Sequence, residues 1–275
     1  MEKVNRGEEW SQRNVPVLTD EDLRFVVETV GDERSGMGQG LDHLRAREDL
    51  LDVLLEDDRL VRSLLEDTRA LLRVSPALVF SVFLRRVIRD LNARPYTLER
   101  TPETVAVFDA TRVHRFVAEP AIWGYLVRML TSFIRTETVT VFTKEGQRYR
   151  RRRFSTLNLE DMIELAGLVG ERETPPIFQR IADIALFTSG IFPDYLRSRR
   201  GRAAREHWRA IPLTAETYEE HGRRFYRLAA GPEGRPNRRV LTALADEFPM
   251  ARKVLELLSD RYLRWTRLSW FHMPC

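Results

Sequence analysis

The sequence is poor in cysteine and has no long hydrophobic run. Its single cysteine, Cys275, rules out a disulfide within the chain and is typical of proteins kept in a reducing cytoplasm. No hydrophobic run approaches the roughly 20 residues that cross a bilayer. Residues 1–16 (MEKVNRGEEWSQRNVP) lack the apolar segment of a signal peptide. These absences predict a cytoplasmic location and no membrane contact.

The sequence also lacks the common catalytic and metal-binding motifs. None of the five histidines stands in a Glu-x-x-His or His-Glu-x-x-His frame, and there is no Gly-x-x-x-x-Gly-Lys phosphate loop or Gly-x-Ser-x-Gly elbow. The best acid–base grouping flanks one proline turn and is more typical of a solvated helix surface: Glu206, His207, Glu219, Glu220 and His221. The sequence therefore predicts no catalytic residue, no metal site and no cofactor.

Charge is distributed unevenly along the chain. The net charge is +4, and only three of the 45 basic residues are lysines. Residues 1–75 hold 18 acidic and 11 basic residues, which makes this part −7 and the remainder +11. Two explanations stay open: the acidic part packs against the basic part, or the basic part faces an anionic partner.

Helical patterns dominate an ordinary globular composition of 43% hydrophobic and 31% charged residues. Thr19 and Ser75, the latter followed by Pro76, are predicted N-caps. The expected helices cover 19–31, 41–56, 58–73, 76–92, 120–137, 158–170, 175–190, 214–231 and 238–271, the last with a kink at Pro249. Residues 104–109 fit a short strand and 110–119 a helix, and both assignments stay open.

The sequence thus predicts a mostly α, multi-helix globular bundle with one small β-hairpin. We expect a flexible tail over 1–18, an acidic helical extension over 19–75 and a main helical domain with a basic surface over 76–275. The hairpin is expected at about 137–154, because β-branched and aromatic residues alternate on both sides of Lys144-Glu145-Gly146-Gln147.

Arginines concentrate at the hairpin and again at 197–209. The candidate nucleic-acid-binding residues are Arg148, Arg150, Arg151, Arg152, Arg153, Arg197, Arg199, Arg200, Arg202 and Arg205. Strand alternation places Arg150 and Arg152 on one face and Arg151 and Arg153 on the other, so one face must do something other than touch nucleic acid. Charge on an edge strand also protects against aggregation. The helix before the hairpin is too apolar to lie in a major groove.

A Phe-x-x-Gly-x-Phe-Pro break precedes a Tyr-x-x-x-Gly-x-x-x-Tyr helix in this chain. The positions are Phe187, Gly190, Phe192, Pro193, Tyr218, Gly222 and Tyr226. Over the C-terminal two-thirds, the chain resembles a family of uncharacterised bacterial helical proteins with these segments. The resemblance implies a helical fold and a bacterial origin and carries no activity. The residues themselves indicate packing, because a glycine between aromatic residues lets another helix approach closely.

Three functional hypotheses follow, in order. The first is a non-enzymatic interaction or scaffold protein with a protein partner or self-association, since the distinctive residues lie on apolar helix faces and in segregated charge. The second is a nucleic-acid-binding protein that uses 148–153 and 197–209. The third is a metal-dependent or hydrolytic enzyme.

Overall fold

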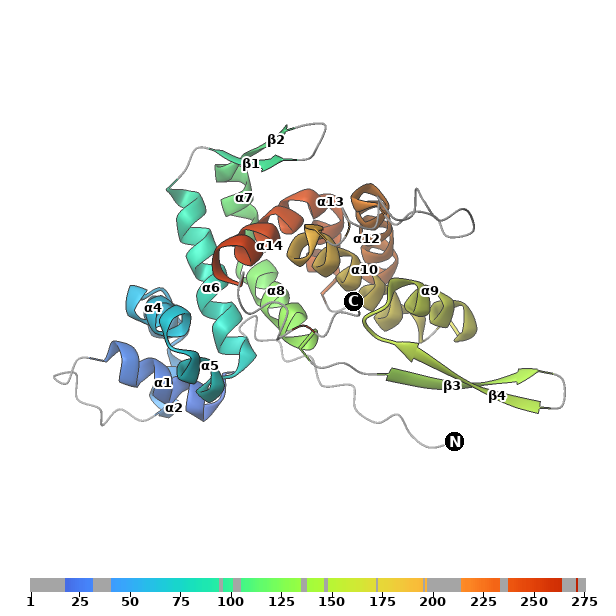
Figure 1. Cartoon of the computed structure of the whole chain (residues 1–275), viewed down its shortest axis with the longest axis horizontal. Helices are drawn as coiled ribbons and strands as arrows, with labels where there is room; N and C mark the ends of the chain where they lie inside the picture. Colours follow the sequence, from blue (N-terminus) through green and yellow to red (C-terminus); the bar gives the residue numbers. More distant parts are fainter. Residues whose placement is uncertain are drawn as a thin grey trace.

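The protein is mostly α-helical, as predicted (Figure 1). The computed structural model describes residues 18–31, 41–93, 96–100, 105–134, 138–145, 148–171, 173–194, 196, 214–232, 237–263 and 271. Within these ranges, no helix is both long enough and apolar enough to span a bilayer.

The described elements are thirteen helices and four strands. The helices are α1 (Asp20–Val30), α2 (Leu41–Ala46), α3 (Glu48–Leu55), α4 (Asp58–Glu66), α5 (Thr68–Arg73), α6 (Pro76–Asn92), α7 (Ala110–Val117), α8 (Pro120–Ser132), α9 (Leu159–Leu168), α10 (Thr174–Ile191), α12 (Ala215–Ala230), α13 (Arg238–Asp246) and α14 (Phe248–Tyr262). The strands are β1 (Tyr96–Arg100), β2 (Val105–Asp109), β3 (Thr138–Glu145) and β4 (Arg148–Ser155).

The two predicted N-caps are confirmed, and one buried carboxylate joins them. Thr19 and Asp22 form a reciprocal capping box at the start of α1, and Ser75 caps α6. The Asp22 carboxylate also accepts hydrogen bonds from the backbone N–H and the hydroxyl of Ser75, both at 2.7 Å. The first turns of α1 and α6 are therefore held together by hydrogen bonds that satisfy a fully buried acid.

Several expected helices are shorter than the sequence pattern suggests. The segment 58–73 divides into α4 and α5 at Asp67, whose side chain accepts from the N–H of Arg69 and begins a new helix. The segment 41–56 also divides into two helices, at Arg47, but no side chain caps the second helix there. The last helix ends and restarts at Glu247 instead of kinking, because Pro249 occupies the first turn of α14.

The core is built around α6, α8 and α10. Helix α10 packs against α9, α12 and α14, while α6 packs against α7, α8 and α14 on one side and α3 and α4 on the other. Phe187 of α10 stacks on Phe133 with ring centroids 4.0 Å apart. Helix α10 continues through Ser189 and Gly190, where a break was expected, because burial against α14 overrides local propensity.

Two antiparallel hairpins project from the helices (Figure 1). The predicted hairpin over 137–154 is confirmed as β3–β4. A second hairpin, β1–β2, pairs Tyr96 with Asp109 and Arg100 with Val105. Its second strand matches the pattern at 104–109, and 110–117 forms the helix α7. Its first strand, Tyr96–Arg100, was not assigned from the sequence, because the alternation of Tyr96 and Leu98 with polar residues is too short to identify a strand.

The expected division into a tail, an extension and a main domain stays a prediction. Residues 1–17 lie outside the described ranges, and Leu18 is buried. Helices α1 to α5 gather at one end of the molecule beside α6, and β3–β4 extends at the opposite end (Figure 1).

Candidate nucleic-acid interface

The register of the β3–β4 hairpin assigns each of its described arginines to a face. The strands pair from Thr138 opposite Ser155 to Glu145 opposite Arg148. Residues directly opposite one another share a face, and faces alternate along a strand. We call the face that carries Arg152 and Phe154 the inner face. The outer face carries Phe142 opposite Arg151, and Thr140 opposite Arg153.

The inner face is attached to helix α9. Phe154 is only 2% exposed, and the Arg152 guanidinium lies 5.3 Å from the centre of its ring. Arg152 also forms an ion pair with Glu164 of α9 at 2.5 Å. The N–H of Ser155 donates to the Asp161 carboxylate at 2.8 Å. Arg152 thus has a structural role, because it helps to hold the base of the hairpin against helix α9.

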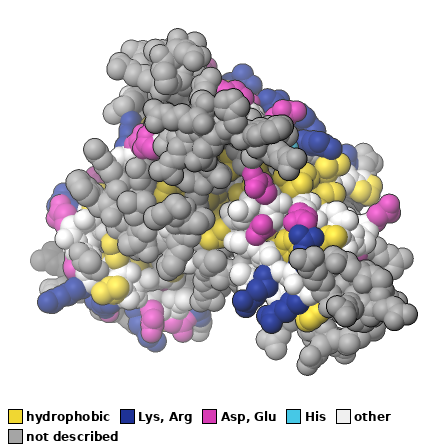
Figure 2. Space-filling model, turned by 45° about the vertical axis from the view of Figure 1, so that its right-hand side comes forward, with side chains coloured by type: hydrophobic (Ala, Val, Ile, Leu, Met, Phe, Trp, Pro, Cys, Tyr) yellow, Lys and Arg dark blue, Asp and Glu magenta, His cyan; other side chains and the backbone are white. Residues whose placement is uncertain are grey.

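The outer face has no such structural role. Arg151 and Arg153 are exposed, and neither side chain forms an ion pair or hydrogen bond with any residue in the described ranges. Phe142, directly opposite Arg151, has 64% of its surface exposed. Figure 2 turns the right-hand side of Figure 1, where β3–β4 lies, toward the viewer. Basic side chains are visible there with hydrophobic ones among them.

Protection of an edge strand does not account for this composition. Charged side chains on an edge strand discourage strand-to-strand aggregation, and this effect can explain the exposed arginines of β4. An exposed phenylalanine beside them has the opposite effect, because it adds apolar surface to the same edge. Edge protection therefore accounts for the arginines of the outer face and not for the exposed Phe142.

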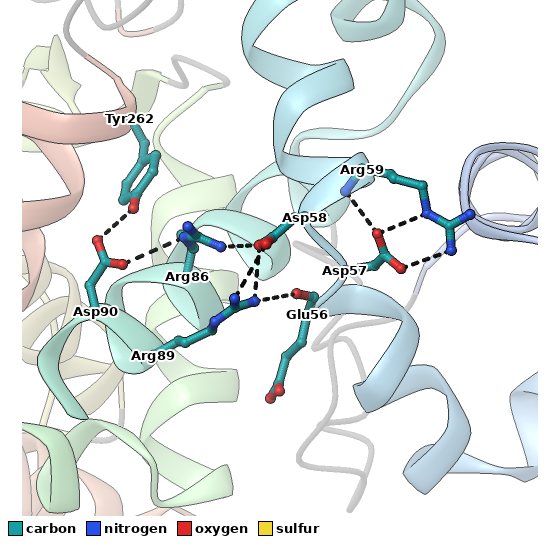
Figure 3. Close-up of polar contacts among 8 residues, drawn as sticks. All are labelled: Glu56, Asp57, Asp58, Arg59, Arg86, Arg89, Asp90 and Tyr262. Carbon is teal, nitrogen blue, oxygen red and sulfur yellow. Dashed lines mark hydrogen bonds and ion pairs between the residues drawn. The ribbon is translucent and has the colours of Figure 1, made fainter. Parts of the chain in front are cut away.

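The acidic N-terminal helices bind other arginines. Asp58 of α4 contacts Arg86 and Arg89 of α6, and Asp90 accepts from the Tyr262 hydroxyl at 2.8 Å (Figure 3). In the same region, Arg85 pairs with Asp52 of α3. In the described part of the chain, the acidic segment therefore packs against the basic helix α6 and leaves the outer face unneutralised. The structure therefore shows the first explanation for the arginines of α6, and an anionic partner for the others stays a prediction.

The remaining arginine candidates are only partly described. Arg148 and Arg150 occupy β4, and the structure describes their place in the strand alone. The second basic concentration lies outside the described residues, with Arg197, Arg199, Arg200, Arg202 and Arg205.

The glycines of the resemblance motif lie at close helix contacts. A Cβ at Gly190 would stand 2.5 Å from the Leu255 Cβ of α14. A Cβ at Gly222 would overlap the ring of Phe248. The aromatic members of the motif are buried around these contacts: Phe187, Phe192, Tyr218 and Tyr226, while Pro193 is partly exposed at the end of α10.

A buried carboxylate that the sequence did not single out lies between α8, α10 and α12. Asp183 accepts hydrogen bonds from the hydroxyls of Tyr125 at 2.6 Å and Tyr226 at 2.8 Å. Burial raises the pKa of Asp183 to about 6, against the opposing effects of the Tyr125 bond, the Arg180 charge and the Tyr226 bond. Its one sequence signal is a lone acid in an apolar run. Because both hydrogen bonds join buried core residues, we assign it a structural role.

The acid–base grouping considered from the sequence does not assemble into a described site. Glu219 pairs with Arg223 on its own helix at 3.5 Å, and His221 stacks on Phe225. Glu206 and His207 lie outside the described residues. Across the described ranges, no group of three or more histidine, cysteine, aspartate or glutamate side chains is placed to hold a metal ion.

Comparison with protein-family models, with curated proteins and with solved structures finds no match to this chain. The functional assignment therefore depends on the geometry of the hairpin.

Proposed function

We propose that this chain is a non-enzymatic binding protein that contacts nucleic acid through the outer face of the β3–β4 hairpin. The observation that carries the proposal is that arginines on the two faces of one strand have different surroundings. Arg152 is paired with Glu164, whereas Arg151 and Arg153 stay exposed beside an exposed phenylalanine. A cytoplasmic location, expected from the single cysteine, belongs to the same proposal.

Arginine spacing on β4 suits a phosphate backbone. Residues two apart on a strand are separated by about 7 Å, which resembles the distance between successive phosphates of an extended nucleic-acid strand. A guanidinium offers paired donors to a phosphate, and each neutralised phosphate releases counterions. Neither the Arg151 nor the Arg153 guanidinium is paired with a carboxylate in the described ranges, so binding of a phosphate would break no ion pair there.

The hairpin is a better candidate than the preceding helix. Helix α8 buries Ile122 through Val127, Met129 and Leu130 in the core, so its apolar face is unavailable to a DNA groove. A winged-helix arrangement with α8 as a recognition helix is therefore disfavoured. Contact through the projecting hairpin needs no rearrangement of the core.

Fluorescence anisotropy with a short labelled oligonucleotide tests the proposal. The variant Arg151→Gln/Arg153→Gln should bind at least about tenfold more weakly at low salt, since each charged hydrogen bond contributes roughly 1.5–3 kcal/mol. The matched control is Arg62→Gln/Arg69→Gln, which removes the same charge from exposed positions on α4 and α5 at the other end of the molecule (Figure 1).

The control should bind like the wild type. Equal weakening in both double variants would show that net charge alone matters and would contradict a site on the hairpin. No binding by the wild type at low salt would reject the function.

Protein association is a second candidate, supported by apolar exposure on the N-terminal helices. Leu72 of α5 is 85% exposed and Leu65 of α4 is 50% exposed. Light scattering over a range of concentrations should show a mass above 32.2 kDa if these side chains mediate self-association. The variant Leu65→Ser/Leu72→Ser should then return the protein to a monomer, and an unchanged assembly would contradict this role.

A further inference from the structure

We infer that the partner of the hairpin is a single-stranded nucleic acid and that Phe142 stacks on one of its bases. This inference rests on the proposed function and specifies its ligand. Arg151 and Arg153 would contact phosphates on either side of the stacked nucleotide, so ring and charges would act together.

Phe142 differs from the other aromatic side chains. It is 64% exposed, whereas every other aromatic side chain that the structure describes is buried or half-buried. The nearest contrast is Phe154 on the same hairpin, which is 2% exposed on the inner face. The inner face of the hairpin therefore buries its aromatic ring, whereas the ring of Phe142 stays exposed on the outer face.

The register places the ring beside Arg151 and Arg153 on the same face of the hairpin. Phe142 is directly opposite Arg151, a relation that puts their Cβ atoms about 5 Å apart. Arg153 is the diagonal neighbour, at roughly 7–8 Å. Both guanidinium groups can thus reach phosphates beside a base that lies on the ring, and either can also stack on that base.

Stacking distinguishes single strands from duplexes. In a duplex, the flat faces of the bases are covered by their neighbours, so an exposed ring finds only base edges. Reading those edges needs donors and acceptors such as Asn, Gln or Arg aligned with the groove. Over the described strands, the register places no Asn or Gln on the outer face, which carries Thr138, Thr140, Phe142, Lys144, Tyr149 and Ser155 beside its two arginines. A single strand presents open base faces, on which aromatic residues stack with little sequence preference.

The test compares one sequence as a single strand and as a blunt duplex, in DNA and in RNA, with polyglutamate as a polyanion without bases. The variants are Phe142→Val, which keeps an apolar β-branched residue without a ring, and Phe142→Tyr, which keeps the ring. Leu228→Ala on α12, another exposed apolar position, is the matched control.

We expect the wild type to prefer the single strand at least about tenfold over the duplex and over polyglutamate. Phe142→Val should lose about five- to a hundredfold in single-strand affinity, the range of one stacked base. Phe142→Tyr and Leu228→Ala should bind like the wild type. In Phe142→Trp, the added indole fluorescence should be quenched when the oligonucleotide binds.

The outcomes separate the inference from the function. Equal affinity for single strand and duplex, or unchanged affinity in Phe142→Val, would overturn the stacking inference. If Arg151→Gln/Arg153→Gln nevertheless lost binding, the proposed function of the hairpin would still hold. Binding to polyglutamate as tight as to the oligonucleotide would overturn the inference in favour of an acidic protein partner. Absence of binding to every nucleic acid would reject both.

Discussion

Replacing Gly222 by alanine should destabilise the protein, although alanine is the better helix former. Gly222 lies inside α12, where its Cα faces the ring of Phe248 at the start of α14. An added Cβ would overlap two or three atoms of that ring. Phe248 is fully buried, so the ring has no free space into which to turn.

The expected magnitude follows from two opposing effects. Overpacking a core costs typically about 1–3 kcal/mol. Glycine to alanine in a helix interior contributes up to about 1 kcal/mol of stability. Because the added Cβ would stand far inside contact distance of the nearest ring atom, the upper half of the overpacking range applies. The net loss in the free energy of unfolding should therefore be about 1–2 kcal/mol, measured by urea denaturation monitored by circular dichroism.

Two further variants isolate the cause. Gly167→Ala in α9 is the control, because a Cβ there meets nothing within 4 Å, and it should leave stability unchanged or raise it. In a Phe248→Leu background the overlapping ring atoms are gone, so Gly222→Ala should cost little, giving a coupling free energy of about 1 kcal/mol or more. A Gly222→Ala protein as stable as Gly167→Ala would refute the close contact between α12 and α14.

Two other predictions concern buried and half-exposed carboxylates. The folded pKa of Asp183, about 6, lies above its ordinary value of 3.8, so its contribution to stability is greatest below about pH 4 and is lost as pH rises to about 6. Asp183→Asn should remove this loss, of roughly 3 kcal/mol, and a parallel pH profile of unfolding in both proteins would contradict the assignment. Asp58→Asn should weaken the α4–α6 junction formed with Arg86 and Arg89, lowering the melting temperature at low salt and much less at high salt. A difference in melting temperature independent of salt would show that the junction is not electrostatic.

The sequence predicts the parts of the fold that local chemistry determines. Thr19 and Ser75 begin helices because their hydroxyls accept the free N–H groups of the first turn, and this needs no distant partner. The β3–β4 hairpin follows from alternation around a turn. The continuity of α10 through Gly190 was not predictable in this way, since it depends on Leu255 of α14.

The candidate site shows the same division. Alternation along β4 establishes from sequence that Arg151 and Arg153 share a face. Which face is covered depends on Glu164, a residue of α9 that no local pattern connects to the hairpin. The partners of the acidic segment likewise lie on α6 and become apparent only when the helices are packed (Figure 3).

The salt dependence of single-strand binding tests the central claim most directly. For single strands, the logarithm of the association constant falls with the logarithm of salt concentration by about 0.7 for each neutralised phosphate. Arg151→Gln/Arg153→Gln should therefore reduce the magnitude of the slope by about 1.4, while Arg62→Gln/Arg69→Gln should leave it unchanged. An unchanged slope in the hairpin variant, or an equal reduction in both, would contradict phosphate contact by the outer face of the hairpin.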